Sequence, residues 1–194
     1  MADTAQKDGN EEIVFQGKIV EVVRQPMRIG KKSVVFESAR RSPGTRLIIV
    51  DLKNKKLIIT KEYRTEIDQY DYRLPGGKVF DSLSEYNQFL KSGSDILKPA
   101  VERATIEARE ETGVIAKKVE HIHTSVNGAT VIWDLFYFVI DEWVQDEQKL
   151  EAGEDISVEW LSFEAANEIA LSGKMQEDRS VAVLLRWLNQ QDNI

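Results

Sequence analysis

The sequence of 194 residues contains no cysteine and only two histidines, His121 and His123. The absence of cysteine excludes disulfide frameworks, thiolate zinc sites and cysteine nucleophiles. The two histidines alternate within an expected strand and have no cluster of other ligands beside them. Ordinary strand positions therefore explain them more simply than a zinc site does.

Long apolar runs and excess positive charge are also missing. No apolar run approaches the ~20 residues that are needed to span a bilayer, and residues 1–12 lack the apolar core of a signal peptide, so we expect them to form a disordered tail. Lys and Arg total 26 against 33 Asp and Glu, a net charge of −7. This balance disfavours nucleic acid and anionic membranes as partners. From the lack of a signal peptide and of a membrane-spanning run, we expect a cytoplasmic protein.

Apolar periodicity predicts an α+β fold. Residues 13–44 read as an N-terminal β extension and residues 45–194 as the main domain. Within the main domain, the apolar runs 46–50 and 57–60 predict a hairpin whose strands are covered on both faces. The order of strands, helix, strands and helices predicts an α-β-α sandwich, a mixed sheet flanked by helices.

A helix predicted from Pro99 to Glu111 carries an unusual acidic end. Glu107, Glu110 and Glu111 converge on one side of it, since residues three and four apart are neighbours on a helix. Three negative charges there also oppose the helix dipole. A divalent cation with oxygen ligands, such as Mg²⁺, is the natural counter-charge.

The simpler alternative is a solvated acidic helix end in which Arg103 pairs with Glu107. The preceding Leu74-Pro75-Gly76-Gly77 favours the metal site instead. Paired glycines let a backbone approach a ligand closely, so the Gly76 carbonyl could complete the coordination.

The run Glu107-Ala108-Arg109-Glu110-Glu111-Thr112-Gly113-Val114, together with Gly77 before it, resembles the signature box of the Nudix hydrolase superfamily. Outside the box the similarity is looser. It runs from about Gln16 onward, with Tyr63-Arg64 and Gly153-Glu154-Asp155 resembling the ADP-ribose pyrophosphatase branch.

This sequence departs from the family pattern at several positions. A spacer of 20 residues separates Gly77 from Lys98, where the family has five, so an insertion lies inside the box. We expect residues 81–97 to form a lid or specificity wall. Lys98 replaces the first glutamate of the box, Ile106 replaces an arginine, and Arg73 stands where the branch often has an acidic residue.

The resemblance implies a metal-dependent hydrolase with Mg²⁺ or Mn²⁺ as cofactor. It implies that the ion is held by Glu107 and Glu111, with Glu110 and Gly76. The general base is expected on the acidic loop before the last strand, where Glu154 is the first candidate and Glu151 the second; both also suit an ordinary acidic surface loop. For contacts with substrate phosphates the candidates are Arg64 first, then Arg46, Arg41 and Arg40, which also suit solvated strand ends.

The implied substrate is a nucleoside diphosphate linked to another group, with ADP-ribose or a nucleotide sugar as the best guess. A nucleoside triphosphate is a third possibility within the enzyme class. The extension resembles the one through which this branch forms homodimers. A catalytically weak or silent nucleotide-binding module is the alternative, which Lys98 and Ile106 favour and the retained carboxylates disfavour.

Overall fold

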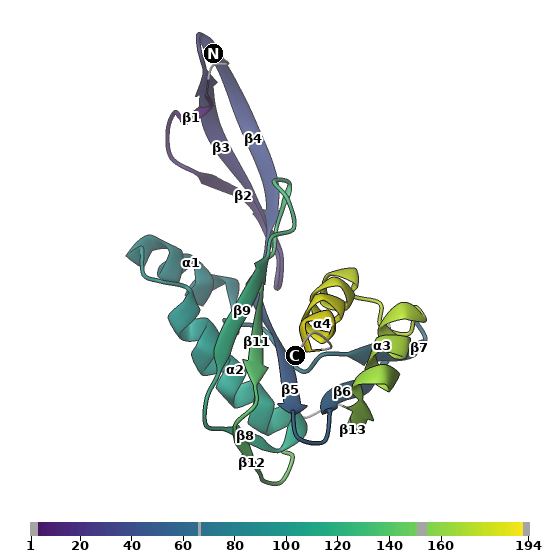
Figure 1. Cartoon of the computed structure of the whole chain (residues 1–194). Coiled ribbons are helices and arrows are strands. Elements are labelled where there is room, and N and C mark those ends of the chain that lie inside the picture. Colours follow the sequence, from purple (N-terminus) through teal and green to yellow (C-terminus); the bar gives the residue numbers. More distant parts are fainter. Residues whose placement is uncertain (1–3, 66, 151–154, 192–194) are drawn as a thin grey trace. The chain divides into compact units, whose positions relative to one another are not determined.

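The computed structural model describes residues 4–65, 67–150 and 155–191. The chain forms two compact units (Figure 1). The first unit combines Met1–Pro43, Lys78–Asp95 and Val126–Asp134. The second combines Gly44–Gly77, Ile96–Ser125 and Leu135–Ile194. Each unit is therefore assembled from segments that are far apart in the sequence.

The first unit is built on a mixed sheet in the order β1–β3–β4–β10, with β2 paired to β3; its pairs are antiparallel except β4–β10, which is parallel. Its one helix among the described residues is α1, which begins after the capping side chain of Ser82 and ends at Gly93. The elements are β1 (Gln6–Lys7), β2 (Glu12–Gln16), β3 (Glu21–Ile29), β4 (Lys32–Arg40), α1 (Leu83–Ser92) and β10 (Val131–Ile132).

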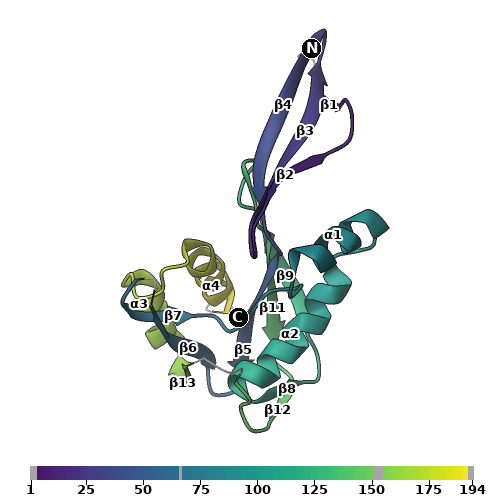
Figure 2. The ribbon, with the colours of Figure 1, turned by 180° about the vertical axis from the view of Figure 1, so that it is seen from behind.

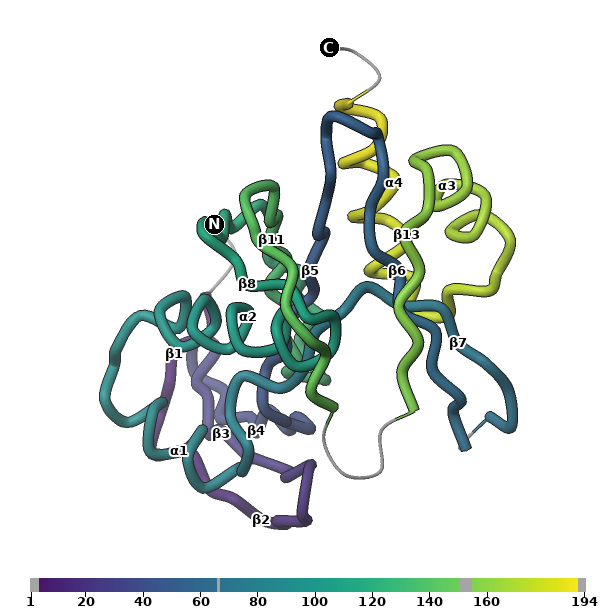
Figure 3. The backbone as a smooth tube through the Cα atoms, turned by 90° about the horizontal axis from the view of Figure 1, so that it is seen from below, coloured from purple at the N-terminus to yellow at the C-terminus, as the bar shows by residue number. Residues whose placement is uncertain are grey.

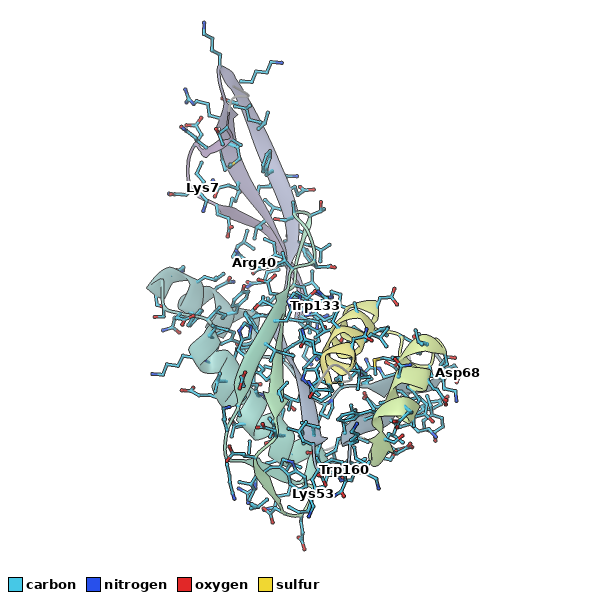
Figure 4. All side chains as sticks on the ribbon, in the orientation of Figure 1. Lys7, Arg40, Lys53, Asp68, Trp133 and Trp160 are labelled. Carbon is cyan, nitrogen blue, oxygen red and sulfur yellow. The ribbon has the colours of Figure 1, made fainter. Side chains whose placement is uncertain are left out.

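Two features of this unit differ from the sequence expectation. Within the expected tail of residues 1–12, the structure places β1, which pairs with β3, and an ion pair of 2.8 Å between Asp8 and Arg28. The expected β extension also includes α1, because Asn87 of α1 donates to Glu21 at 2.9 Å and accepts from Arg40 at 3.1 Å. Arg40 lies at the end of β4 (Figure 4). The predicted insertion thus belongs to the same unit as the N-terminal strands.

The second unit holds a six-stranded mixed sheet in the order β13–β6–β5–β11–β9, with β7 paired to β6, and a small β12–β8 pair. Its elements are β5 (Gly44–Asp51), β6 (Lys56–Arg64), β7 (Gln69–Arg73), α2 (Leu97–Thr112), β8 (Val114–Ala116), β9 (Glu120–Ser125), β11 (Leu135–Ile140), β12 (Trp143–Gln145), β13 (Ile156–Ser162), α3 (Phe163–Leu171) and α4 (Asp178–Gln191).

Helices cover both faces of this sheet. Figures 1 and 2 show α2 on one face, with α3 and α4 on the other, and Figure 3 shows the same arrangement from below. Strands buried on both faces are continuously apolar, and residues 47–50 and 57–59 are all fully buried. The predicted mixed sheet flanked by helices is confirmed. None of the helices in the described ranges is long and apolar enough to cross a membrane.

Candidate active site

Small side chains bring α2 close to the sheet and bury the acidic end of the helix. Ala100, Ala104 and Ala108 recur every four residues and are fully buried, which gives the helix a narrow apolar stripe. Glu107 and Glu111 lie on neighbouring turns and are only 6% and 9% exposed. Burial of a carboxylate is costly unless it is paired or hydrogen-bonded, so their partners define the site.

The double-glycine turn lies directly against these carboxylates. The backbone N–H of Gly76 donates to Glu111 Oε2 at 2.7 Å. A Cβ added to Gly77 would lie 1.8 Å from Glu107 Oε1, and one added to Gly76 would lie 2.2 Å from the Thr45 carbonyl oxygen. Gly76 also has φ +141°, a conformation that is favourable only for glycine. Both glycines are therefore required by the close approach of backbone, strand and carboxylates.

The turn is also hydrogen-bonded to β5. The N–H of Thr45 donates to the Gly77 carbonyl at 2.8 Å, and the N–H of Leu47 donates to the Pro75 carbonyl at 2.9 Å. The turn therefore lies between β5 on one side and the end of α2 on the other. The contact of Gly76 with a carboxylate is made by its amide; the predicted role of its carbonyl as a metal ligand stays a prediction.

Arg103 supplies a positive charge within this cluster. Its Nε donates to Glu107 Oε1 at 2.8 Å, and the two side chains are 19% and 7% exposed. This is the pair that the sequence left open as the alternative to a metal. Ile106, at the position where the family has an arginine, is 45% exposed.

The three predicted carboxylate ligands are not gathered around one point. Glu110 is half-buried, and the described part of the chain contains no group of three or more Asp, Glu or His side chains that could hold a metal ion. Glu107 and Glu111 share the side of α2 that meets the glycine turn, and both offer oxygen donors of the type that Mg²⁺ prefers. The ligand assignment stays a prediction.

The acidic loop after β12 reaches the end of α2. Gln148 Nε2 donates to the Glu111 carbonyl at 2.7 Å, and the N–H of Lys149 donates to the Glu110 carbonyl at 3.0 Å. These contacts satisfy carbonyls that a helix end leaves open. The two predicted general bases, Glu151 and Glu154, lie outside the described residues.

The predicted phosphate-binding arginines occupy different surroundings. Arg46 is 5% exposed, and its guanidinium donates to both carboxylate oxygens of Glu177, at 2.7 and 3.2 Å. Arg64 donates to both oxygens of Glu62 at 3.1 Å. Arg41 belongs to the first unit, where its guanidinium lies 4.3 Å from the centre of the Trp133 ring. Of these three, Arg46 has the surroundings of a structural residue.

Sequence reasoning missed Glu177, the partner of Arg46. It precedes α4 and also accepts from the hydroxyl of Ser180 at 2.6 Å. Burial alone would raise the pKa of Glu177, but the positive charge of Arg46 holds this pKa below its usual value. The pair is separated by 131 positions, so no local pattern could have indicated it.

Asp71 and Arg73 form a second charged group beside the turn. Burial raises the pKa of the Asp71 carboxyl above its usual value. Burial also lowers the pKa of Arg73, and the positive charge of Arg46 lowers it further. Perturbed ionisable groups of this kind are typical of functional sites.

A pocket of about 400 Å³ lies elsewhere in the second unit, between α4 and the β9–β11 edge of the sheet. It is lined by His123, Arg186 and Trp187 among others, and by none of the predicted site residues. The helix-end carboxylates therefore lie at the glycine turn and outside this pocket.

Comparison with known proteins gives the fold and a distant relative. No family model matches the chain. A solved structure described as an ADP compounds hydrolase aligns with a TM-score of 0.68 at 17% identity, covering 100% of this chain and 98% of that one. The predicted α-β-α sandwich is confirmed by this likeness.

A curated protein is similar to this chain over most of its length. The ADP-ribose pyrophosphatase of Bacillus subtilis (strain 168) is 26% identical over 184 residues, which cover 93% of this chain and 88% of the relative. The resemblance to the ADP-ribose pyrophosphatase-like branch is thereby confirmed.

Proposed function

We propose that this protein hydrolyses the diphosphate of a nucleoside diphosphate linked to another group, with ADP-ribose or a nucleotide sugar as substrate. Water would attack one phosphorus and the bridging P–O bond would break, giving a nucleoside monophosphate and a phosphorylated second product. The observation that carries this proposal is the packing of the buried Glu107 and Glu111 against the Gly76-Gly77 turn.

Mg²⁺ or Mn²⁺ is the proposed cofactor, held by Glu107 and Glu111 with Glu110 and the Gly76 carbonyl. Such an ion neutralises phosphate charge and lowers the pKa of a bound water. Arg103 contacts Glu107 through Oε1, so Glu107 would hold the ion while Arg103 supplies a positive charge beside it.

Glu154 is the proposed general base and Glu151 the second candidate. The contacts of Gln148 and Lys149 with the last turn of α2 support this proposal, because they bring the start of the same loop to the carboxylate end of the helix. A base must come within hydrogen-bond reach of the attacking water.

Arg64 is the first proposed phosphate ligand, since its side chain is 32% exposed. The weaker candidate Arg41 lies beside Trp133 in the first unit. Arg46 was also a candidate, but its burial with Glu177 supports a structural role instead.

Hydrolysis of ADP-ribose with Mg²⁺, followed by phosphatase-coupled phosphate release, tests this function. Glu111→Gln should lower kcat by at least about a hundredfold while the circular dichroism spectrum stays unchanged. Glu102→Gln, on an exposed position of the same helix, is the matched control and should keep full activity. Equal activity of both variants and the wild type would refute the assignment.

A silent nucleotide-binding module is the second candidate. It is favoured by the Arg103–Glu107 pair, in which the arginine compensates the charge of one carboxylate without a metal ion. Calorimetric binding of ADP-ribose without any turnover in Mg²⁺ or Mn²⁺ would establish this alternative.

A homodimer is proposed through the first unit. Its strands and their connections expose large apolar side chains to an extent that is unusual for a monomer, namely Ile13, Phe15, Ile19, Val35 and Phe36, which are 43–59% exposed. Light scattering after size exclusion should give twice the chain mass, 2 × 22.2 kDa. A monomer at micromolar concentration would contradict the proposal.

A further inference from the structure

The face of the β6–β7 hairpin beside the glycine turn carries a charged cluster, of which the proposed diphosphate site uses only Arg64. The register pairs Glu62 with Asp71 and Thr60 with Arg73. Glu62, Arg64, Asp71 and Arg73 therefore lie on one face, because side chains alternate along a strand. Arg73 ends β7, three residues before Gly76.

The carboxylates on this face hold Arg73 only loosely. Its Nη1 lies 3.5 Å from Glu62 Oε2 and its Nε lies 3.5 Å from Asp71 Oδ2, whereas the Arg46–Glu177 contact measures 2.7 Å. Glu62 is shared, since Arg64 occupies both of its oxygens at 3.1 Å. Asp71 is engaged as well, because its Oδ1 accepts from the N–H of Gln176 at 3.1 Å.

Both carboxylates that Arg73 contacts are therefore shared with other donors. The Arg73 side chain is largely covered but keeps 25% exposure, so a solute can reach it. Burial lowers the pKa of Arg73, and the positive charges of Arg46 and Arg64 lower it further, against the opposing effect of Glu177 and Asp71. A planar guanidinium in this setting is suited to bind a carboxylate or a phosphate through two parallel hydrogen bonds.

We propose that Arg73, beside the proposed phosphate ligand Arg64, forms a subsite for a second anionic group, so that the preferred substrate is a nucleoside diphosphate linked to an acidic moiety. The linked group would carry a carboxylate or a phosphate in addition to the diphosphate. This inference rests on the proposed function, because it places the subsite next to the turn that would hold the diphosphate.

The test compares neutral and acidic substrates that are otherwise matched. UDP-glucose and UDP-glucuronate differ by a carboxylate, and ADP-ribose and ADP-ribose 1″-phosphate differ by a phosphate. We expect kcat/KM to favour the acidic member of at least one pair by about tenfold or more, the range for charge-assisted hydrogen bonds. The pair that shows the preference identifies which anion the subsite takes.

Variants assign the preference to Arg73. Arg73→Gln should bring the acidic-to-neutral ratio of kcat/KM close to one. Arg73→Lys keeps the positive charge but not the two parallel donors of the guanidinium, and it should keep part of the preference. Arg186→Gln, an exposed arginine on α4, makes the same change in net charge and should leave the ratio unchanged. A wild-type ratio near one for both pairs, or a preference that Arg73→Gln leaves intact, would overturn the inference.

Failure of the proposed function can be distinguished from failure of the proposed subsite. If no compound is hydrolysed, the same ratios are measured as Kd values by calorimetry, on the wild type and on Arg73→Gln. Tighter binding of the acidic compounds that is lost in Arg73→Gln would still support the subsite, whereas equal Kd values would refute it.

Discussion

The two units use the same kinds of residue in opposite settings. The second unit buries the ion pair Arg46–Glu177, with side chains 6% and 15% exposed. The first unit buries Arg40–Glu21, with side chains 8% and 0% exposed, but leaves Arg24–Glu37 52% and 55% exposed. Isoleucine is fully buried at Ile58 and 56% exposed at Ile19. The second unit thus has a continuously apolar interior in its central strands, while the strands of the first unit present apolar surface that a further partner could cover.

Glycines also occur in closely packed and in open settings, and substitution of the closely packed Gly76 gives the largest expected effect. Gly76→Ala would place a Cβ 2.2 Å from a backbone oxygen at φ +141°, and no side-chain rotation relieves such an overlap. We expect a loss of about 4 kcal/mol in the free energy of unfolding, measured by urea denaturation, together with loss of activity.

Gly128→Ala in the first unit is the control for this change. Gly128 also has a positive φ, +82°, but nothing lies within 4 Å of the added Cβ. It should cost only about 1 kcal/mol. Equal losses at the two positions would mean that backbone conformation alone, and not the close packing of the turn, determines the requirement for glycine.

Much of the second unit could be predicted because its signals are local. The apolar runs of the β5–β6 hairpin, the carboxylates of α2 and the left-handed cap at Gly113, with φ +67°, depend on residues close in sequence. The sequence predicted that Gly76 lies close to Glu111. The contact between them is made by the amide of Gly76, whereas the prediction concerned its carbonyl.

Long-range pairing could not be predicted in the same way. The partner of Arg46 follows it by 131 positions. The largely apolar segment from Val131 to Ile140 divides into β10, which pairs in parallel with β4, and β11, which pairs in parallel with β5. Periodicity reports which face of a strand is apolar, but not which strand lies beside it.

The buried ion pair gives the next largest effect. Glu177→Gln leaves the Arg46 guanidinium buried without its counter-charge, which should cost about 3 kcal/mol at pH 7. Glu37→Gln removes the exposed partner of Arg24 and should cost less than about 1 kcal/mol. Urea denaturation of both variants measures the difference. Similar costs would contradict the contrast between the buried and the exposed ion pair.

The dependence of this effect on pH follows from the lowered pKa of Glu177. A carboxyl whose pKa is lower in the folded than in the unfolded chain contributes stability above its unfolded pKa. That contribution is lost as the pH falls from about 4.5, the usual value, through the folded pKa. The difference in Tm between the wild type and Glu177→Gln should therefore be constant near neutral pH and shrink in acid.

The smallest expected effect concerns a single methylene. Ile58→Val should cost about 1 kcal/mol, because its fully buried site cannot relax completely around the lost group. Ile19→Val, at an exposed position, should cost close to nothing in a monomer. In the proposed homodimer, however, Ile19 would be covered by the second copy, and its substitution would lower the apparent stability only at concentrations where the dimer forms. Denaturation of both variants at two protein concentrations a hundredfold apart separates the cases. A concentration-independent cost at Ile19 equal to that at Ile58 would mean that Ile19 is buried within its own chain. It would contradict the difference in exposure between these two isoleucines.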